Sequence, residues 1–462
     1  MSRNALTAAA ASLFLFSALN GARAGAQSAL DNAAKALGAA NLTSIQYSGS
    51  GSTFTLGQNV NPTTPWPKVG LKSFTRTVDY TSPAYLEETV RITPAGEQRQ
   101  TQAVSGKHAW NVAANGNATP ALPAVAERLT QIWITPHGFL KAALANRASA
   151  KSKTEGGKKV TVVSFTGQGK YKMSGVIAAD GTVARVETFL DNPVLGDMPV
   201  ETTYSDYKDF GTVKFPTRIV QKQGGYPMLE LTVTDVKPNA PLSLAVPPAV
   251  ASATLPAVTV ESQKLADGVW YLTGGSHHSV LVEFKDHVVV IEGPLNADRS
   301  KAVMAEVKKL VPSKPLRYLV NTHHHFDHSG GLRAYAAAGV TIVTHEINKP
   351  FYARAFKGKF QTVGDKQVMT DGSRTLELHL IKGNTHNDGL LMGYLPKEKL
   401  LVEVDLYTPP APNAALPPMP NPAAVNLYEN VERLKLDVTQ VAALHGRVVP
   451  IADLQRAAGR AP

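Results

Sequence analysis

The sequence of 462 residues contains no cysteine. This absence excludes disulfide bonds, a lipid anchor attached to a cysteine and thiolate ligands to a metal, so the fold has to be stabilised by packing. The sequence also has no long basic run with interleaved aromatic residues, and no Gly-rich phosphate loop or serine-elbow motif in a convincing context. The formal charge of +11 is scattered and indicates solubility, with a mild preference for anionic substrates. We therefore expect a small-molecule substrate and no nucleic-acid partner.

After the N-terminus the sequence has no long hydrophobic run, because every later apolar stretch is broken by proline, glycine or charge. The N-terminus itself has Arg3, an apolar stretch over 5–19 and small residues at Ala22-Arg23-Ala24. This pattern predicts a signal peptide over residues 1–24, and it is short for the alternative, a membrane anchor. The protein is expected to be periplasmic or secreted, with no integral membrane segment after signal cleavage. The sequence does not indicate its oligomeric state.

The length of the chain favours two folded domains. Residues 28–240 form the first, β-rich domain, in which apolar and polar residues alternate as in half-buried strands. The predicted strands cover 45–57, 158–167, 171–190 with a turn at Ala179-Asp180-Gly181, and 228–237, and a helix interrupted near Pro136 covers 121–146. We expect a curved, mainly antiparallel sheet with a helical segment on it. The stretch "YSDYKDFGTVKFPTRIV" (204–220) resembles the sheet of periplasmic lipoprotein-carrier proteins.

Residues 241–258 are rich in proline and alanine and are predicted to be a semi-extended linker, in which Pro247-Pro248 prevents regular structure. From 259 to 462 short strands alternate with helices, which is typical of α/β layers. The expected helices cover 297–311, 331–340 and 423–436, and the last of them precedes the apolar stretch 441–450. The expected strands include 316–322, 341–345, 374–383 and 399–407.

The stretch "NTHHHFDHSGG" (321–331) places four of the 13 histidines and one aspartate in six positions, at the end of a predicted strand. Residues two apart can face the same way there, so His323 and His325 are expected to point together and His324 elsewhere. Asp327 and His328 follow on the turn into a helix. Loops at the ends of α/β strands concentrate catalytic groups, whereas the alternative is a solvated polar loop.

Three further polar residues stand at the ends of later apolar runs, namely His386, Asp405 and His445. Imidazole nitrogens and carboxylate oxygens are the ligands that zinc prefers, and a catalytic zinc site needs three protein ligands and a water. The downstream residues could complete such a site. A surface histidine loop would not need them.

The H-x-H-x-D-H string followed by His, Asp and His resembles the metallo-β-lactamase superfamily over roughly 259–450. The resemblance implies a C-terminal αββα sandwich, which gives an overall α+β and α/β class. It implies that His323, His325 and His386 hold a first metal, that Asp327, His328 and His445 hold a second, and that Asp405 bridges them, as in hydrolases resembling glyoxalase II. Two Zn²⁺ are expected, with Fe or Mn also possible.

The activity implied by this resemblance is that of an exported hydrolase. It would use a hydroxide bridging two metals to cleave an activated carbonyl such as a lactam, a lactone or another ester-like bond. Asp327 would act as the catalytic residue that orients the hydroxide and passes on its proton. His325 stands where related oxygen-reducing diiron enzymes have Glu, which favours hydrolysis. The alternatives are a mononuclear-iron sulfur dioxygenase, or an exported lipid- or partner-binding protein with an accessory metal domain.

Several weaker candidates stay open. Glu292 in "VVVIEGP" stands where the family often has Asp, and it could support the site. His277 and His278 could line the site mouth, although strand-edge polarity explains them equally. The Pro-rich stretch 409–422 could cover the site or merely connect two elements. The remaining histidines are read as structural; they are His108, His137, His287, His345 and His379.

Overall fold

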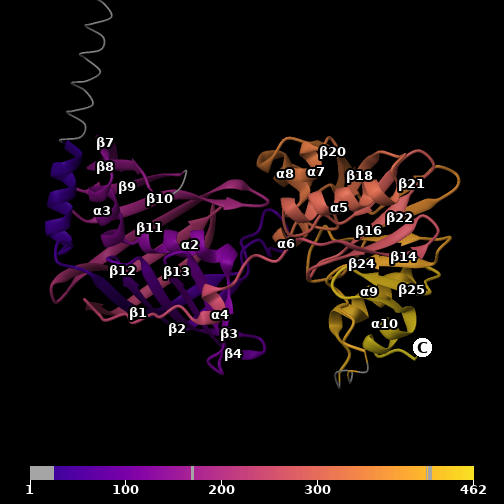
Figure 1. Cartoon of the computed structure of the whole chain (residues 1–462), viewed down its shortest axis with the longest axis horizontal. Coiled ribbons are helices and arrows are strands. Elements are labelled where there is room, and N and C mark those ends of the chain that lie inside the picture. The colour runs from indigo at the N-terminus through magenta and orange to yellow at the C-terminus, as the bar shows by residue number, and fades with distance from the viewer. Residues whose placement is uncertain (1–24, 168–170, 413, 415–418, 462) are drawn as a thin grey trace, which may run out of the picture. The chain divides into compact units, whose positions relative to one another are not determined.

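A computed structural model describes residues 25–167, 171–412, 414 and 419–461. The predicted signal peptide, 1–24, lies outside these residues, as does part of the Pro-rich stretch 409–422. The chain divides into two compact units, coloured from indigo to yellow in Figure 1. The first consists of the residues up to Thr55, Pro67–Asp191 and Asp197–Leu255, and the second of Leu56–Trp66, Asn192–Gly196 and the residues from Pro256. Two short segments from within the predicted N-terminal domain thus belong to the C-terminal unit.

The first unit is built on one 13-stranded sheet with the order β6-β5-β4-β3-β2-β1-β13-β12-β11-β10-β9-β8-β7 (Figure 1). Strand β12 illustrates the alternation that favours a half-buried strand. Val213, Phe215 and Ile219 are buried on one face of the sheet, while Lys214 and Arg218 are more exposed. The strands are β1 Ser44–Phe54, β2 Lys68–Asp79, β3 Ala84–Thr93, β4 Gly96–Ser105, β5 His108–Val112, β6 Ala118–Pro120, β7 Ser149–Glu155, β8 Lys158–Thr166, β9 Lys172–Ala178, β10 Val183–Asn192, β11 Gly196–Phe210, β12 Val213–Gln223 and β13 Tyr226–Pro238. The central pairs β1·β13, β1·β2 and β12·β13 are antiparallel, which confirms the predicted architecture.

Helical segments pack on this sheet (Figure 1). They are 25–37, the 3₁₀ turn η1 Leu122–Ala124, α2 Val125–Trp133 and α3 Pro136–Ala145. The predicted interruption near Pro136 is confirmed. The break lies at Thr135, whose side chain caps α3 by accepting a hydrogen bond from the Gly138 amide at 3.1 Å. Pro136 fits the first turn of α3, where no backbone N–H is needed.

The linker 241–258 is mostly irregular, but it contains a single helical turn, α4 Pro248–Ala251. The prediction that Pro247-Pro248 prevents regular structure is therefore wrong at this point. Proline is disfavoured inside a helix but is suited to its first position, which Pro248 occupies. The turn buries Val250 against Ala103 and Trp110.

The second unit contains two sheets, with orders β14-β15-β16-β17-β18-β19-β20 and β21-β22-β23-β24-β25-β26 (Figure 1). Its strands are β14 Glu261–Ala266, β15 Val269–Thr273, β16 Ser279–Glu283, β17 Val288–Ile291, β18 Leu316–Val320, β19 Thr341–His345, β20 Lys359–Val363, β21 Lys366–Thr370, β22 Thr375–Leu380, β23 Leu391–Leu395, β24 Leu400–Glu403, β25 Gln440–Ala443 and β26 Val448–Pro450. Its helices are α5 Ala297–Leu310, α6 Phe326–Ser329, α7 Leu332–Ala337, α8 Lys349–Ala355, α9 Pro422–Arg433 and α10 Ile451–Ala457.

This unit has four layers because successive side chains along its buried strands point to opposite faces of the sheet, one face packing on helices and the other on the second sheet. In β17, Val288 and Val290 pack in one cluster with α5, α7 and α8, whereas Val289 and Ile291 pack in the other cluster with the second sheet. Helices α9 and α10 contribute to that second cluster through Leu427 and Leu454. The arrangement confirms the predicted αββα sandwich. No helix within the described ranges is both long enough and apolar enough to span a bilayer.

His137 gives the first unit a testable pH dependence. Its ring is buried, and Nε2 donates a hydrogen bond to the Leu37 carbonyl at 3.0 Å. Burial lowers the pKa of His137 from 6.5 to about 4. Between these values the unfolded chain binds a proton that the folded chain does not. The free energy of unfolding should therefore fall as the pH falls from about 6.5 to about 4, by at most about 1.4 kcal/mol per pH unit.

The variant His137→Gln, which does not titrate, should lose this part of the pH dependence. Hydrogen-exchange mass spectrometry of the full chain, read on peptides covering 125–145, measures the difference between the two proteins. An identical pH slope in both would contradict the role of His137.

Candidate metal centre

The histidine loop is held by buried polar contacts immediately after β18. The Asn321 side chain donates to the His323 carbonyl at 2.6 Å, and its own oxygen accepts from the hydroxyls of Thr344 (3.0 Å) and Tyr352 (2.7 Å). The Ser329 hydroxyl, one turn later in α6, lies 2.7 Å from the His325 carbonyl. These contacts end the strand at Val320, two residues before the predicted end, and fix the backbone from which the histidines project.

The first group of possible ligands consists of His323, His325, His386 and Asp405, with one ligand atom of each within 4.8 Å of the others. Nε2 of His386 lies 3.3 Å from Nε2 of His323. His323 and His325 follow β18, and His386 follows β22. Strands of two different sheets therefore bring the three imidazoles together.

The second group consists of His277, Asp327, His328 and His445, again within 4.8 Å. Nε2 of His445 lies 3.0 Å from Nε2 of His328. The carboxylate oxygen Oδ2 of Asp327 lies 3.3 Å from Nε2 of His277 and 3.5 Å from Nε2 of His328. The grouping adds His277 to the three residues expected from the sequence, which had left this histidine open.

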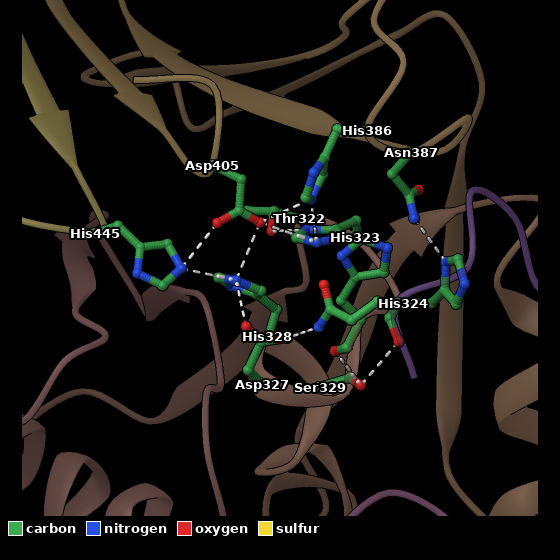
Figure 2. Close-up of polar contacts among 12 residues, drawn as sticks. Thr322, His323, His324, Asp327, His328, Ser329, His386, Asn387, Asp405 and His445 are labelled. Atoms are coloured by element: carbon green, nitrogen blue, oxygen red, sulfur yellow. Dashed lines mark hydrogen bonds and ion pairs between the residues drawn. The ribbon is translucent and has the colours of Figure 1, made fainter. Parts of the chain in front are cut away.

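Asp405 joins the two groups (Figure 2). Its Oδ2 lies 3.2 Å from Nε2 of His323, 3.1 Å from that of His328 and 2.9 Å from that of His386. Its Oδ1 lies 2.8 Å from Nε2 of His445. The backbone of Asp405 has a φ of 66°, which is unusual for a residue with a side chain and is typical of functional sites. Strand β24 therefore ends at Glu403, and the prediction of a strand over 399–407 is wrong beyond that residue.

This donor set fits a borderline metal ion. Two imidazole nitrogens whose lone pairs face each other at 3.0–3.3 Å repel unless a proton or a cation lies between them. Two nitrogens bound at about 2.0–2.1 Å to one tetrahedral zinc are themselves about 3.3 Å apart. The nitrogens and carboxylate oxygens present here are also the ligand types that zinc, iron and manganese accept.

The protonation states agree with this fit. Burial holds the pKa of His323 well below its usual value and lowers that of His325 to about 4, so both rings are neutral ligands at neutral pH. Burial alone would lower the pKa of His328 too, but the Asp405 and Glu292 carboxylates outweigh it and raise this pKa to about 10. A cation at Nε2 of His328 would have to displace that proton, as metal binding generally does.

Glu292 lies beneath the cluster, fully buried and with a φ of 78°. Its Oε2 accepts a hydrogen bond from the Thr322 hydroxyl and lies 3.5 Å from Nδ1 of His328. The same hydroxyl lies 3.1 Å from Nδ1 of His323. These contacts leave Nε2 of both histidines facing Asp405, which is the arrangement by which carboxylates orient metal-binding histidines.

The other histidines lie outside both groups. His324 turns away from the cluster toward Asn387, as expected (Figure 2). Its Nε2 lies 3.1 Å from Oδ1 of Asn59. His278 packs on Tyr271. His287, His345 and His379 contact Asp286, Ile347 and Glu377 respectively, and His108 lies on β5.

Sequence reasoning missed one set of residues at this site, the segment 56–66. Nε2 of Gln58 donates to Oδ1 of Asp327 at 2.8 Å, and the Asn59 carbonyl accepts from Nε2 of His325 at 3.0 Å. No motif marks this segment, which follows a predicted strand more than 250 residues before the histidines.

Comparison with known proteins gives the following matches. Residues 272–424 match the model of the Metallo-beta-lactamase superfamily. That range contains every expected ligand except His445. A curated relative, 2,4-dinitroanisole O-demethylase subunit alpha of Nocardioides sp. (strain JS1661), is 27% identical over 153 residues. The alignment covers 31% of this chain and 46% of that protein, so the chain spans less than half of the relative's length.

Among solved structures, a metallo-beta-lactamase from Pontibacter korlensis is 22% identical, with 44% of this chain and 98% of that protein covered and a TM-score of 0.36. The metallo-beta-lactamase from Hirschia baltica is 20% identical, with 44% and 97% covered and a TM-score of 0.36. The family match lies within the αββα unit and includes the H-x-H-x-D-H string. Residues 272–424 of the C-terminal unit are therefore similar to the metallo-β-lactamase superfamily.

Proposed function

We propose that the chain is an exported, zinc-dependent hydrolase that holds two metal ions and cleaves an activated carbonyl in a small molecule. The observation that carries the proposal is the Asp405 carboxylate, which lies within 2.8–3.2 Å of four imidazole nitrogens from two groups. The signal-like sequence of residues 1–24 supports export.

The proposed ligands are those expected from the sequence. His323, His325 and His386 would hold one ion, Asp327, His328 and His445 the other, and Asp405 both. When bound, such a pair supplies Lewis-acid stabilisation of negative charge and lowers the pKa of a coordinated water to about 7.

The residue best suited to move a proton is Asp327. Burial would raise the pKa of its carboxyl, but hydrogen bonding to His277 and the charge of His328 hold this pKa below the usual value. The side chain is about one-third exposed (36%), so it can reach a substrate while being ionised at neutral pH. Oδ2 of Asp327 can accept the proton of the attacking water and pass it to the leaving group.

The relative's name favours a second candidate reaction, the O-demethylation of an activated aryl ether such as 2,4-dinitroanisole. Both reactions displace a leaving group from an electron-poor carbon. A substrate panel that contains a lactam, a lactone, a thioester and 2,4-dinitroanisole separates them.

Metal analysis tests the proposal first. The mature protein should bind two Zn²⁺ per chain. Asp405→Asn should lose at least one of them because the amide lacks the negative charge that faces four imidazoles. Inductively coupled plasma mass spectrometry after dialysis measures the stoichiometry. His108→Ala, which removes a histidine on β5 of the first unit, should keep both ions.

A protein that binds no metal would end the proposal. A single iron per chain with oxygen consumption would instead favour the sulfur dioxygenase alternative.

Turnover by Asp327→Ala is the second test. Loss of the proton-accepting oxygen should lower kcat by about 10²–10⁴-fold on whichever reporter the wild-type protein hydrolyses. Steady-state kinetics at saturating zinc measure the change. Turnover equal to that of the wild-type protein would rule out Asp327 as the group that moves the proton.

A further inference from the structure

Residues 56–66 connect β1 with β2 of the N-terminal sheet, yet they form part of the second compact unit. Backbone hydrogen bonds attach the segment to both ligand-bearing loops. The Phe326 amide donates to the Gly57 carbonyl at 3.3 Å, and the Asp388 amide donates to the Val60 carbonyl at 2.8 Å. The segment thus contacts both the histidine string and the His386 loop.

The Asn59 carbonyl determines which nitrogen of His325 is free. The carbonyl is only an acceptor, so Nε2 of His325, 3.0 Å away, carries the proton and donates it. Nδ1 is then left without a proton, with a lone pair available to a cation. A hydrogen bond of this kind from a ligating histidine to a backbone carbonyl fixes both the tautomer and the ring orientation.

Gln58 has a similar effect on Asp327. Its side-chain amide donates to Oδ1 at 2.8 Å, which occupies that oxygen and leaves Oδ2 facing His328 and His277. One expected ligand of each metal position is therefore oriented by two consecutive residues of the segment.

The segment has a shape of its own that holds these two residues in place. The buried Asn59 side chain donates to the carbonyls of Asn61 (2.7 Å) and Thr64 (2.9 Å), while its oxygen accepts from Nε2 of His324 at 3.1 Å. Asn61 donates to the Asp388 carboxylate at 2.9 Å. Side chains as well as backbone therefore attach the segment to the histidine string and to the His386 loop.

Gly57 and Trp66 close the contact with the histidine loop. Gly57 has a φ of 69°, and a Cβ there would lie 2.2 Å from the Phe326 ring, so only glycine allows this approach. The Trp66 ring packs edge-on against the same ring, with centroids 6.2 Å apart. Phe326 lies between His325 and Asp327 in the sequence, so this packing fixes the backbone of both.

We propose that residues 56–66 are an integral part of the metal centre, in which Asn59 and Gln58 act as positioning residues for His325 and Asp327. The inference rests on the proposed function, because it assumes that these side chains bind metal. It assigns to the loop between two N-terminal strands a role in metal affinity that the C-terminal domain alone does not supply.

Zinc affinity of full-length variants tests the inference. Gln58→Met keeps the length of the side chain but removes the donor to Asp327, and Asn59→Ala removes the bonds that hold the segment in shape. Each should raise the Kd for Zn²⁺ by about 10–100-fold. Competition with a chromophoric chelator measures the Kd, and the visible absorption spectrum of the Co²⁺-loaded proteins should shift because the ligand geometry changes. The matched control is Gln98→Met, which alters an exposed glutamine on β4 and should change neither readout.

The outcomes separate this inference from the proposed function. If the wild-type protein binds two Zn²⁺ and both variants bind them within about twofold of its Kd with an unchanged Co²⁺ spectrum, the segment has no positioning role, although the hydrolase proposal stands. If the wild-type protein binds no Zn²⁺, the proposed function fails and the inference with it. Should Asn59→Ala fail to fold, as judged by circular dichroism, Gln58→Met decides the question alone, since its side chain makes the contact with Asp327 that is being tested.

Discussion

The placement of one carboxylate among four imidazoles is the constraint on which the site depends. Asp405 is 12% exposed in its side chain and faces His323, His328, His386 and His445. Burial would raise its pKa, but the surrounding histidines hold this pKa far below the usual range. Burying this charge together with so many nitrogen and oxygen lone pairs costs free energy unless the groups share a bound cation. The αββα unit brings together the ends of β18, β22, β24 and β25 to satisfy this requirement.

The surrounding structure supports that cluster in layers of decreasing polarity. Glu292 and Thr322 contact the far nitrogens of His323 and His328, and the Asn321 amide fixes the backbone between them. Beyond these groups lie the apolar strands, whose alternate residues fill the two cores of the sandwich. Rigid strands hold the short loops in which the ligands lie, which is how a scaffold achieves the precision that metal coordination needs.

The segment 56–66 changes how the two-part organisation of the chain is understood. Sequence reasoning treats the N-terminal domain and the C-terminal sandwich as separate modules joined by the linker 241–258. The contacts of Asn59 with His325 and of Gln58 with Asp327 mean that the C-terminal unit is incomplete without residues that lie before β2. A loop of the β-rich half is thereby a candidate determinant of how the site binds its ligands, whichever substrate it processes.

The sequence by itself determined the class of the fold, because strand alternation and the crowded H-x-H-x-D-H string are patterns contained within a few consecutive residues. The expected ligand set, with the distant His386, Asp405 and His445, followed from the resemblance to the metallo-β-lactamase superfamily. The sequence also indicated the break at Thr135-Pro136, since proline acts on its immediate neighbours. Only the tertiary structure decided the end of β24 at Glu403, the helical turn at Pro248 and the roles of His277, Glu292 and residues 56–66. These features depend on contacts between residues that are distant along the chain, and neither hydrophobic period nor spacing records which distant groups will meet.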